Sequence, residues 1–198
     1  KVLCWQGFMN QLVTRKPVRK MADLRGMRLK VVGDVSNALK ELGVEGMSIS
    51  AAETYVGLQK GILDGVIIPV EAIESLKFAE VAKYVTLINF YSTHSGSRMM
   101  NVDKFNSLPP DVKKVLDNNI EYYSRETEAE FNRHNQHAME EGKKLGVEFI
   151  PISKEEMAKF YAPMKVIAEK EAQGLDAKGL PGTKIHNEAQ RLIQQYSK

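Results

Sequence analysis

Three short apolar segments, each followed by signals for a helix, constrain the fold more than any other feature of the sequence. The segments are Met27–Val32, Gly46–Ile49 and Gly65–Ile68. After the second segment, Ser50 and Glu53 have the spacing of a helix capping box. Gly61 has the position of a left-handed helix stop, which predicts a helix over Ala51–Lys60. Strand–helix repeats with connections this short predict an α/β fold with a mostly parallel sheet and crossover helices.

The second half of the chain is expected to be mainly helical. From Asp111 to Leu145 there is no proline and one glycine, and the apolar residues fall roughly on one stripe. A helix of about 30 residues is about 45 Å long, more than the width of a compact lobe, so we expect it to brace two bodies. The remaining predicted elements are a helix over Val70–Lys77, strands over Tyr84–Tyr91, Arg98–Val102 and Val147–Ile150, and helices that begin at Ser153 and Thr183.

The composition is that of an ordinary globular protein, with 43% hydrophobic and 27% charged residues. The net charge of +3 is mildly basic, and cations are scattered among acids. Seven basic residues near the start favour a solvated face or an anion-binding site over a nucleic-acid partner, and they are Arg15, Lys16, Arg19, Lys20, Arg25, Arg28 and Lys30. No apolar run approaches the roughly 20 residues that span a bilayer. The single cysteine, Cys4, excludes an intrachain disulfide and does not decide the compartment.

Motifs for metal or catalytic chemistry are weak. His134 and His137 lie three residues apart on one predicted helix face, but solvated histidines are the more common outcome and no HExxH pattern is present. Ser95 beside His94 lacks the GxSxG pattern of a nucleophile elbow and is better interpreted as part of a loop. Neither a GxGxxG nor a Walker phosphate loop occurs. The sequence therefore predicts no cofactor and no metal site.

Four stretches, in this order and spacing, carry a resemblance to a known family. They read KPVRKMADLRGMRLKV, SISAAETYVGLQKGILDGVIIPVEAI, KFAEVAKYVT and FNSLPPDVKKVL, within residues 10–145. Together they resemble the extracytoplasmic solute-binding subunits of TRAP (tripartite ATP-independent periplasmic) transporters. The resemblance implies a non-enzymatic, periplasmic protein of the periplasmic-binding-protein-like α/β fold, with two lobes that close on a ligand. It also implies two partners: a small organic solute, expected to be an organic acid, and the membrane permease subunits of the transporter.

The resemblance covers only the later part of such a protein, so the first lobe is expected to be largely missing. Residues 1–92 are then the second α/β lobe, 93–108 a strand segment that crosses the hinge, 109–145 a long bracing helix, and 146–198 a C-terminal strand and helices. The chain begins inside an apolar segment without an initiator Met or a signal peptide, which fits this expectation.

Three polar ligand positions of the family differ in this chain. The family arginine that pairs with a substrate carboxylate, at the end of a Gly-x-x-x-Arg run, is replaced by Lys30. A second family arginine falls near Asn10 or Gln11, and the asparagine after the Val-Asp-Gly motif falls at Ile68. Lysine keeps the charge but lacks the planar fork that holds a carboxylate with two hydrogen bonds. The ligand is expected to be less anionic and more apolar than a C4-dicarboxylate or a sialic acid, or to be held by a looser clamp that includes Lys30.

Glu71, Tyr91 and His94 are further candidate ligand-binding residues, because they follow the segments that approach the implied cleft. Ordinary structural explanations compete with these roles. Glu71 suits the first turn of a helix, where the helix dipole favours an acid, and Tyr91 suits a core. From the residue pattern alone, Lys30 is equally interpretable as a strand-end cation that reaches solvent, and the family resemblance favours contact with the ligand. Arg28 shares its strand face and falls at a variable position of the family pattern.

Two other functions stay open at this level. One is a small α/β hydrolase-like enzyme, which requires His94 within hydrogen-bond reach of a nucleophile and an acid. The other is the effector-sensing lobe of a transcriptional regulator, which requires a DNA-binding segment in addition to this chain.

Overall fold

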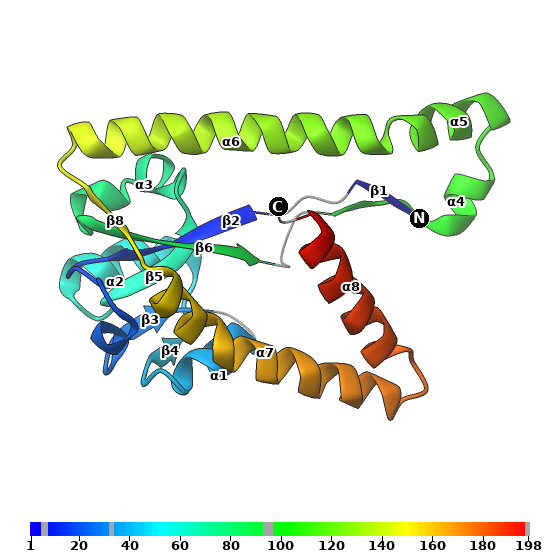
Figure 1. Ribbon diagram of the computed structural model, residues 1–198. Coiled ribbons are helices and arrows are strands. Elements are labelled where there is room, and N and C mark those ends of the chain that lie inside the picture. Colours follow the sequence, from blue (N-terminus) through cyan, green and yellow to red (C-terminus); the bar gives the residue numbers. More distant parts are fainter. Residues whose placement is uncertain (5–7, 32–33, 93–96, 197–198) are drawn as a thin grey trace.

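A computed structural model describes residues 1–4, 8–31, 34–92 and 97–196 of the chain. A six-stranded sheet forms its centre, in the order β4–β3–β5–β2–β6–β8 (Figure 1). In that order the strands are Glu45–Met47, Arg28–Lys30, Gly65–Pro69, Phe8–Thr14, Tyr84–Ser92 and Glu148–Pro151. The pairs β3–β4, β3–β5 and β6–β8 are parallel, and of the described strands in this sheet β2 alone runs antiparallel to its neighbours. The predicted α/β fold with a mostly parallel sheet is confirmed.

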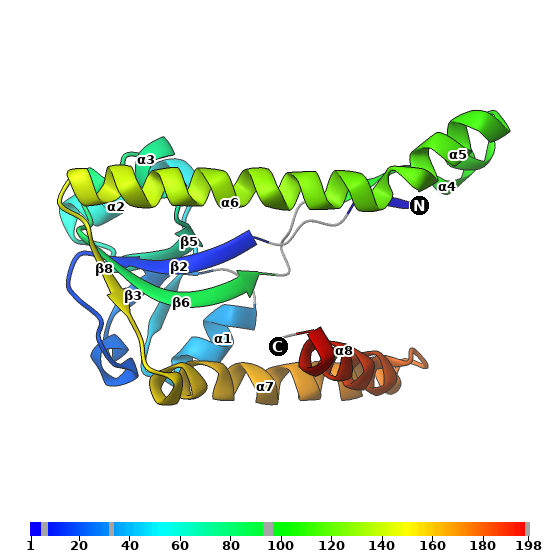
Figure 2. The same ribbon diagram turned by 45° about the horizontal axis from the view of Figure 1, so that its top comes forward.

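Helices cover both faces of this sheet (Figures 1 and 2). The first face packs on α1 (Asp34–Lys40), the 3-10 helix η1 (Met21–Leu24) and α7 (Lys154–Asp176). The second face packs on α2 (Ala51–Lys60), α3 (Ala72–Ser75), the 3-10 helix η2 (Phe78–Glu80) and α6 (Ile120–Lys144). The sheet has one hydrophobic core on each face. The adjacent residues Leu12 and Val13 of β2 pack into different cores, because side chains alternate along a strand. The sheet is therefore the middle layer of three.

Local sequence accounts for helix α2 as predicted. The Ser50 hydroxyl accepts a hydrogen bond from the Glu53 amide at 3.2 Å, and the Glu53 carboxylate accepts one from the Ser50 amide at 3.0 Å. These bonds complete a capping box. The Ser50 hydroxyl also donates to the Glu53 carboxylate at 2.7 Å, and this hydrogen bond lowers the pKa of Glu53. Gly61 ends the helix with a φ of 73°, a conformation that glycine adopts without a steric penalty.

The structure differs from the sequence prediction in the helix after β5, in the strand after β6 and in the predicted long helix. Helix α3 stops at Ser75, short of the predicted end, and Lys77 then adopts a left-handed φ of 56°. Strand β7 is only Arg98–Met99, because Asn101 caps a new helix, α4 (Val102–Asn106), through its side-chain oxygen. The predicted single long helix is two helices, α5 (Pro110–Asn118) and α6, separated at Asn119.

A second, two-stranded sheet lies away from the main one. It pairs β1 (Val2–Cys4) with β7 in antiparallel orientation. Figure 1 shows α6 running from this small sheet along the whole length of the main sheet. With 25 residues, α6 is about 38 Å long. At the small-sheet end, the Ser124 hydroxyl of α6 lies 3.8 Å from the Cys4 sulfur of β1.

The C-terminal helices form a hairpin below the main sheet (Figures 1 and 2). The N-cap of α7 is Ser153, whose hydroxyl accepts from the Glu156 amide, as the sequence predicts. Helix α8 (Gly182–Tyr196) returns along α7. Gly182 lies where these helices meet, and a Cβ at this position would overlap the Ala172 carbonyl oxygen. Only glycine therefore allows this close approach.

Candidate functional site

The carboxyl ends of the parallel strands bring most of the predicted ligand-binding residues to one edge of the main sheet. Strands β3, β5 and β6 end at this edge and the antiparallel β2 begins there. Gln11 pairs with Ile68, and Asn10 pairs with Pro69 on one side and Phe90 on the other. In open α/β sheets this edge is where ligands usually bind.

Lys30 shares a face of the sheet with Ile68. It pairs with Val66, which lies two residues before Ile68 on β5, a separation of about 7 Å along the strand. Val66 belongs to the core cluster of the second face, and Ile68 packs against that cluster. Strand alternation therefore directs Lys30, Ile68 and Gln11 to the second face and Asn10 to the first.

The two cations of β3 have different environments. Arg28 donates from Nη2 to the Gly61 carbonyl at 2.7 Å and from Nε to the Asp64 carboxylate at 3.2 Å. Among the residues that the structure describes, the Lys30 ammonium has no hydrogen-bond or ion-pair partner. Partial burial lowers the pKa of Lys30, because removal from water disfavours the charged form. An anion that approached Lys30 would supply the missing partner.

The two polar residues near the start of β2 are buried and already hydrogen-bonded. Asn10 is 7% exposed and donates from Nδ2 to the Phe90 carbonyl at 3.3 Å. Gln11 is 3% exposed, and both ends of its amide contact Asn89. Asn89 was not recognised from the sequence, since its importance depends on its φ of 47° and on a partner strand 78 residues away.

The other candidates are only partly described. Ile68 and Glu71 are half-buried. Glu71 occupies the N-cap position of α3, and in the described part of the chain its carboxylate has no hydrogen-bond partner. Tyr91 lies in β6 and its backbone pairs with Met9. His94 lies outside the described residues.

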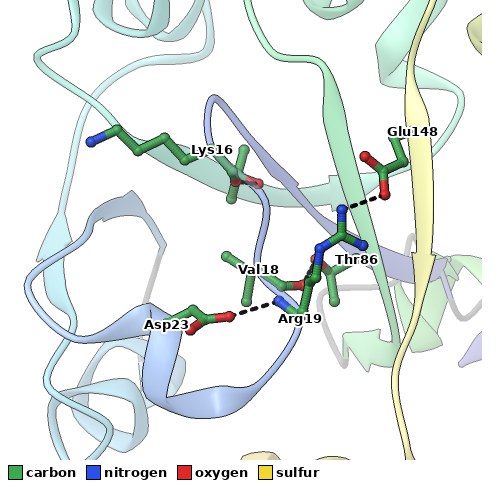
Figure 3. A network of polar contacts seen from close by, with 7 residues as sticks. Lys16, Val18, Arg19, Asp23, Thr86 and Glu148 are labelled. Atoms are coloured by element: carbon green, nitrogen blue, oxygen red, sulfur yellow. Dashed lines mark hydrogen bonds and ion pairs between the residues drawn. The ribbon is translucent and has the colours of Figure 1, made fainter.

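At the opposite edge of the main sheet, a polar network includes Lys16 and Arg19, two of the seven basic residues near the start of the chain (Figure 3). The hydroxyls of Thr14 and Thr86, both 0% exposed, donate to the carbonyls of Lys16 and Val18 at 2.7 Å each. Arg19 forms an ion pair of 2.7 Å with Glu148, and its amide donates to Asp23 at 2.9 Å. These contacts fix the loop after β2 onto the sheet. Arg19 is thus paired within the protein.

The histidines predicted as a weak metal candidate have separate acidic neighbours. His134 lies 2.9 Å from Glu130 of the same helix, and His137 lies 3.7 Å from Glu74 of α3. Over residues 1–4, 8–31, 34–92 and 97–196, no group of three or more His, Cys, Asp or Glu side chains could hold a metal ion. In the same ranges no helix has both the length and the apolar character needed to cross a membrane.

A shallow pocket of about 150 Å³ lies on the second face, beside η2 and the end of α6. Its lining residues are Ile73, Glu74, Lys77, Ala79, Glu80, Lys83 and Leu145. None of the predicted ligand-binding residues is among them.

Solved structures share this architecture. A TRAP periplasmic solute-binding protein from Desulfovibrio salexigens matches with a TM-score of 0.85 and 28% sequence identity, over 99% of this chain and 62% of that one. Another such protein, from Citrobacter koseri, matches with a TM-score of 0.70 and 26% identity, over 86% of this chain and 63% of that one.

Sequence comparisons point the same way. The 2,3-diketo-L-gulonate-binding periplasmic protein YiaO of Escherichia coli is 31% identical over 59% of this chain and 36% of its own length. The C4-dicarboxylate-binding periplasmic protein DctP of Vibrio cholerae is 29% identical over 65% of this chain and 39% of its own length. The chain thus spans little more than a third of these relatives. Residues 2–174 match the DctP family, and the chain belongs to these bacterial extracellular solute-binding proteins of family 7.

Proposed function

We propose that the full-length protein is the periplasmic solute-binding subunit of a TRAP transporter and that this chain supplies its second lobe. The subunit captures a small organic acid between two lobes and delivers it to the membrane permease without chemical change. The observation that carries the proposal is Lys30, a partly desolvated ammonium without a described partner, at the sheet edge where α/β proteins bind ligands. The names of the two bacterial relatives, which specify acids as ligands, support the same ligand class.

The surroundings of Lys30 favour an acid with one carboxylate. A lysine ammonium presents a point charge and no second parallel hydrogen bond, so it holds a carboxylate less rigidly than arginine does. Its neighbour across the strand pair is Met47, and Ile68 lies on the same face, so the site is apolar around the charge. Glu71, at the start of α3, would repel a second carboxylate and would accept a hydrogen bond from a hydroxyl. We therefore propose a hydroxylated monocarboxylate as the ligand.

Thermal unfolding of the full-length protein with matched acids tests this function. Gluconate and glucarate share one carbon skeleton and differ in having one or two carboxylates. A ligand at about 100 times its Kd stabilises the bound protein by about 2.7 kcal/mol, which gives a readily measured rise in Tm. We expect a larger rise with gluconate than with glucarate and no product after incubation. The absence of a shift with any acid, or the detection of a product, would contradict a role in solute binding.

Variants of β3 test the role of Lys30 by calorimetric titration with gluconate. Lys30→Met keeps the length of the side chain and removes the charge. It should weaken binding by about 10- to 100-fold, which corresponds to the free energy of one hydrogen bond to a charged group. Lys30→Arg should retain most of the affinity. Arg28→Met is the matched control, because it removes a cation from the same face of the same strand, where the partner is Asp64. Equal losses in Lys30→Met and Arg28→Met would show that Lys30 has no special role.

A further inference from the structure

Strand β6 is irregular where it approaches the candidate ligand edge. Leu12 of β2 pairs with Thr86, but Asn10 pairs with Phe90. One residue of β2, Gln11, therefore faces the three residues 87–89 of β6, which form a β-bulge. Bulges bend a strand and change where its end points, and they are frequent next to functional sites.

The bulge ends in an unusual backbone conformation. Asn89 has a φ of 47°, and in the described part of the chain only Lys77 is another non-glycine residue with positive φ. Asparagine tolerates this left-handed region better than most residues, but the conformation still needs support from its surroundings.

Gln11 supports Asn89 from the second face of the sheet. Gln11 Nε2 donates to Asn89 Oδ1 at 2.9 Å, and the Asn89 amide donates to Gln11 Oε1 at 2.9 Å. The two bonds use the donor and the acceptor of the Gln11 amide together. Because Gln11 is 3% exposed, water cannot easily replace either bond.

Tyr161 of α7 supports the same residue from the first face. Its hydroxyl donates to the Asn89 carbonyl at 2.9 Å. Its ring packs against Phe90, with 6.3 Å between ring centroids, and edge-on against Phe160 at 5.5 Å. Asn89 is thus held on both sides of the sheet by residues from β2 and α7.

We propose that Gln11, Asn89 and Tyr161 form a positioning lock for the ligand site. The lock holds the bulge of β6 in one conformation and so sets the direction of the last residues of β6, Phe90–Ser92, at the ligand edge. Gln11 stands near the place of a family arginine, but it acts through Asn89 and not by contact with the solute. The inference rests on the proposed function, since it assigns these residues to the binding of the same acid.

Hydrogen exchange of the full-length protein tests the lock without any ligand. Gln11→Leu replaces the amide with an apolar side chain of similar size and removes both hydrogen bonds. We expect the peptide that contains Asn89 and Phe90 to exchange at least tenfold faster, while the β2–β5 pairing around Leu12 and Ile67 keeps its rate. An unchanged rate at Asn89, or an equal acceleration throughout the sheet, would overturn the proposal. This arm stays informative even if no acid binds.

Binding of gluconate to paired variants tests the consequence for function. Both Asn89→Ala and Asn89→Gly remove the side-chain amide of Asn89. Alanine has a Cβ, which disfavours the left-handed backbone conformation, whereas glycine adopts that conformation freely. We expect Asn89→Gly to bind at least fivefold more tightly than Asn89→Ala, and Gln11→Leu and Tyr161→Phe to weaken binding at least fivefold. Asn89 is exposed, so its variants should fold even if Gln11→Leu does not.

Three results would overturn the lock. Loss of affinity in Gln11→Leu with wild-type affinity in Asn89→Ala would mean that Gln11 contacts the solute directly. Equal affinities of Asn89→Gly and Asn89→Ala would mean that the backbone conformation is irrelevant to binding. A lower Tm in every variant with unchanged affinity would mean that the contacts serve packing alone.

Discussion

Replacement of Thr86 by valine should destabilise the fold through a single lost hydroxyl. Thr86 is 0% exposed, and its hydroxyl donates to the Val18 carbonyl at 2.7 Å. Valine has nearly the same shape, so Thr86→Val creates no cavity. Val18 is itself 0% exposed, and its carbonyl would be left buried without this donor.

The expected cost follows from that burial. A buried polar group left without a partner costs about 1–3 kcal/mol, and the added methyl of valine offsets only part of it, so we expect a loss of about 2 kcal/mol. Thr14→Val is the matched control. Thr14 is equally buried, but its hydroxyl donates to the carbonyl of Lys16. Lys16 is exposed, so water can replace the Thr14 hydroxyl as the donor to this carbonyl. We expect a loss of about 1 kcal/mol or less there.

Equilibrium urea unfolding followed by circular dichroism measures both losses. The midpoint should fall more for Thr86→Val than for Thr14→Val, with the slope m unchanged in both variants. Equal losses would refute the argument that the burial of the acceptor decides the cost. A changed slope would show instead that the substitution altered the compactness of one of the two states.

Three further predictions follow from single contacts. Because burial lowers the pKa of Lys30, titration calorimetry should show gluconate affinity falling at a pH below the ordinary lysine pKa of about 10.4, and Lys30→Arg should remove this fall. The Ser50 hydrogen bonds lower the pKa of Glu53, so Glu53 stabilises the fold above its unfolded pKa of about 4.3, and that contribution disappears as the pH falls through the lower folded value. Acid unfolding of Ser50→Ala should lack this contribution. Gly182→Ala should separate α8 from α7, and limited proteolysis should then cut the connection at residues 177–181 faster.

Features set by neighbouring residues were predictable from the sequence. The capping box at Ser50, the stop at Gly61 and the N-cap at Ser153 depend on residues three to eleven positions apart, and each is present in the structure. The same is true of the α/β class, because a strand–helix repeat with short connections has few other solutions.

Features that depend on distant partners were not predictable. The early stop of α3 places Lys77 in a left-handed conformation, which no local signal indicates. The bulge at Asn89 exists only in the pairing of β6 with β2, and its partner Gln11 lies 78 residues away. The sequence therefore pointed to Gln11 as a position of interest through the family pattern, but its hydrogen-bond partner came from the structure. Whether Lys30 and Glu71 bind the solute stays a prediction.

The connections between the two sheets give the lock a wider consequence. Two strand segments lead from the main sheet to the small one, β1 to β2 and β6 to β7, and α6 spans the same distance (Figure 1). Gln11 and Asn89 join the two strand segments to each other just before they leave the main sheet. If two lobes close around a solute, strands that are tied here and stay paired as far as Phe8 and Ser92 should move as one ribbon. Helix α6 has no proline, and the break before it at Asn119 lies at the far end. The lock would then keep β2 and β6 in register during this movement as well as shape the ligand edge.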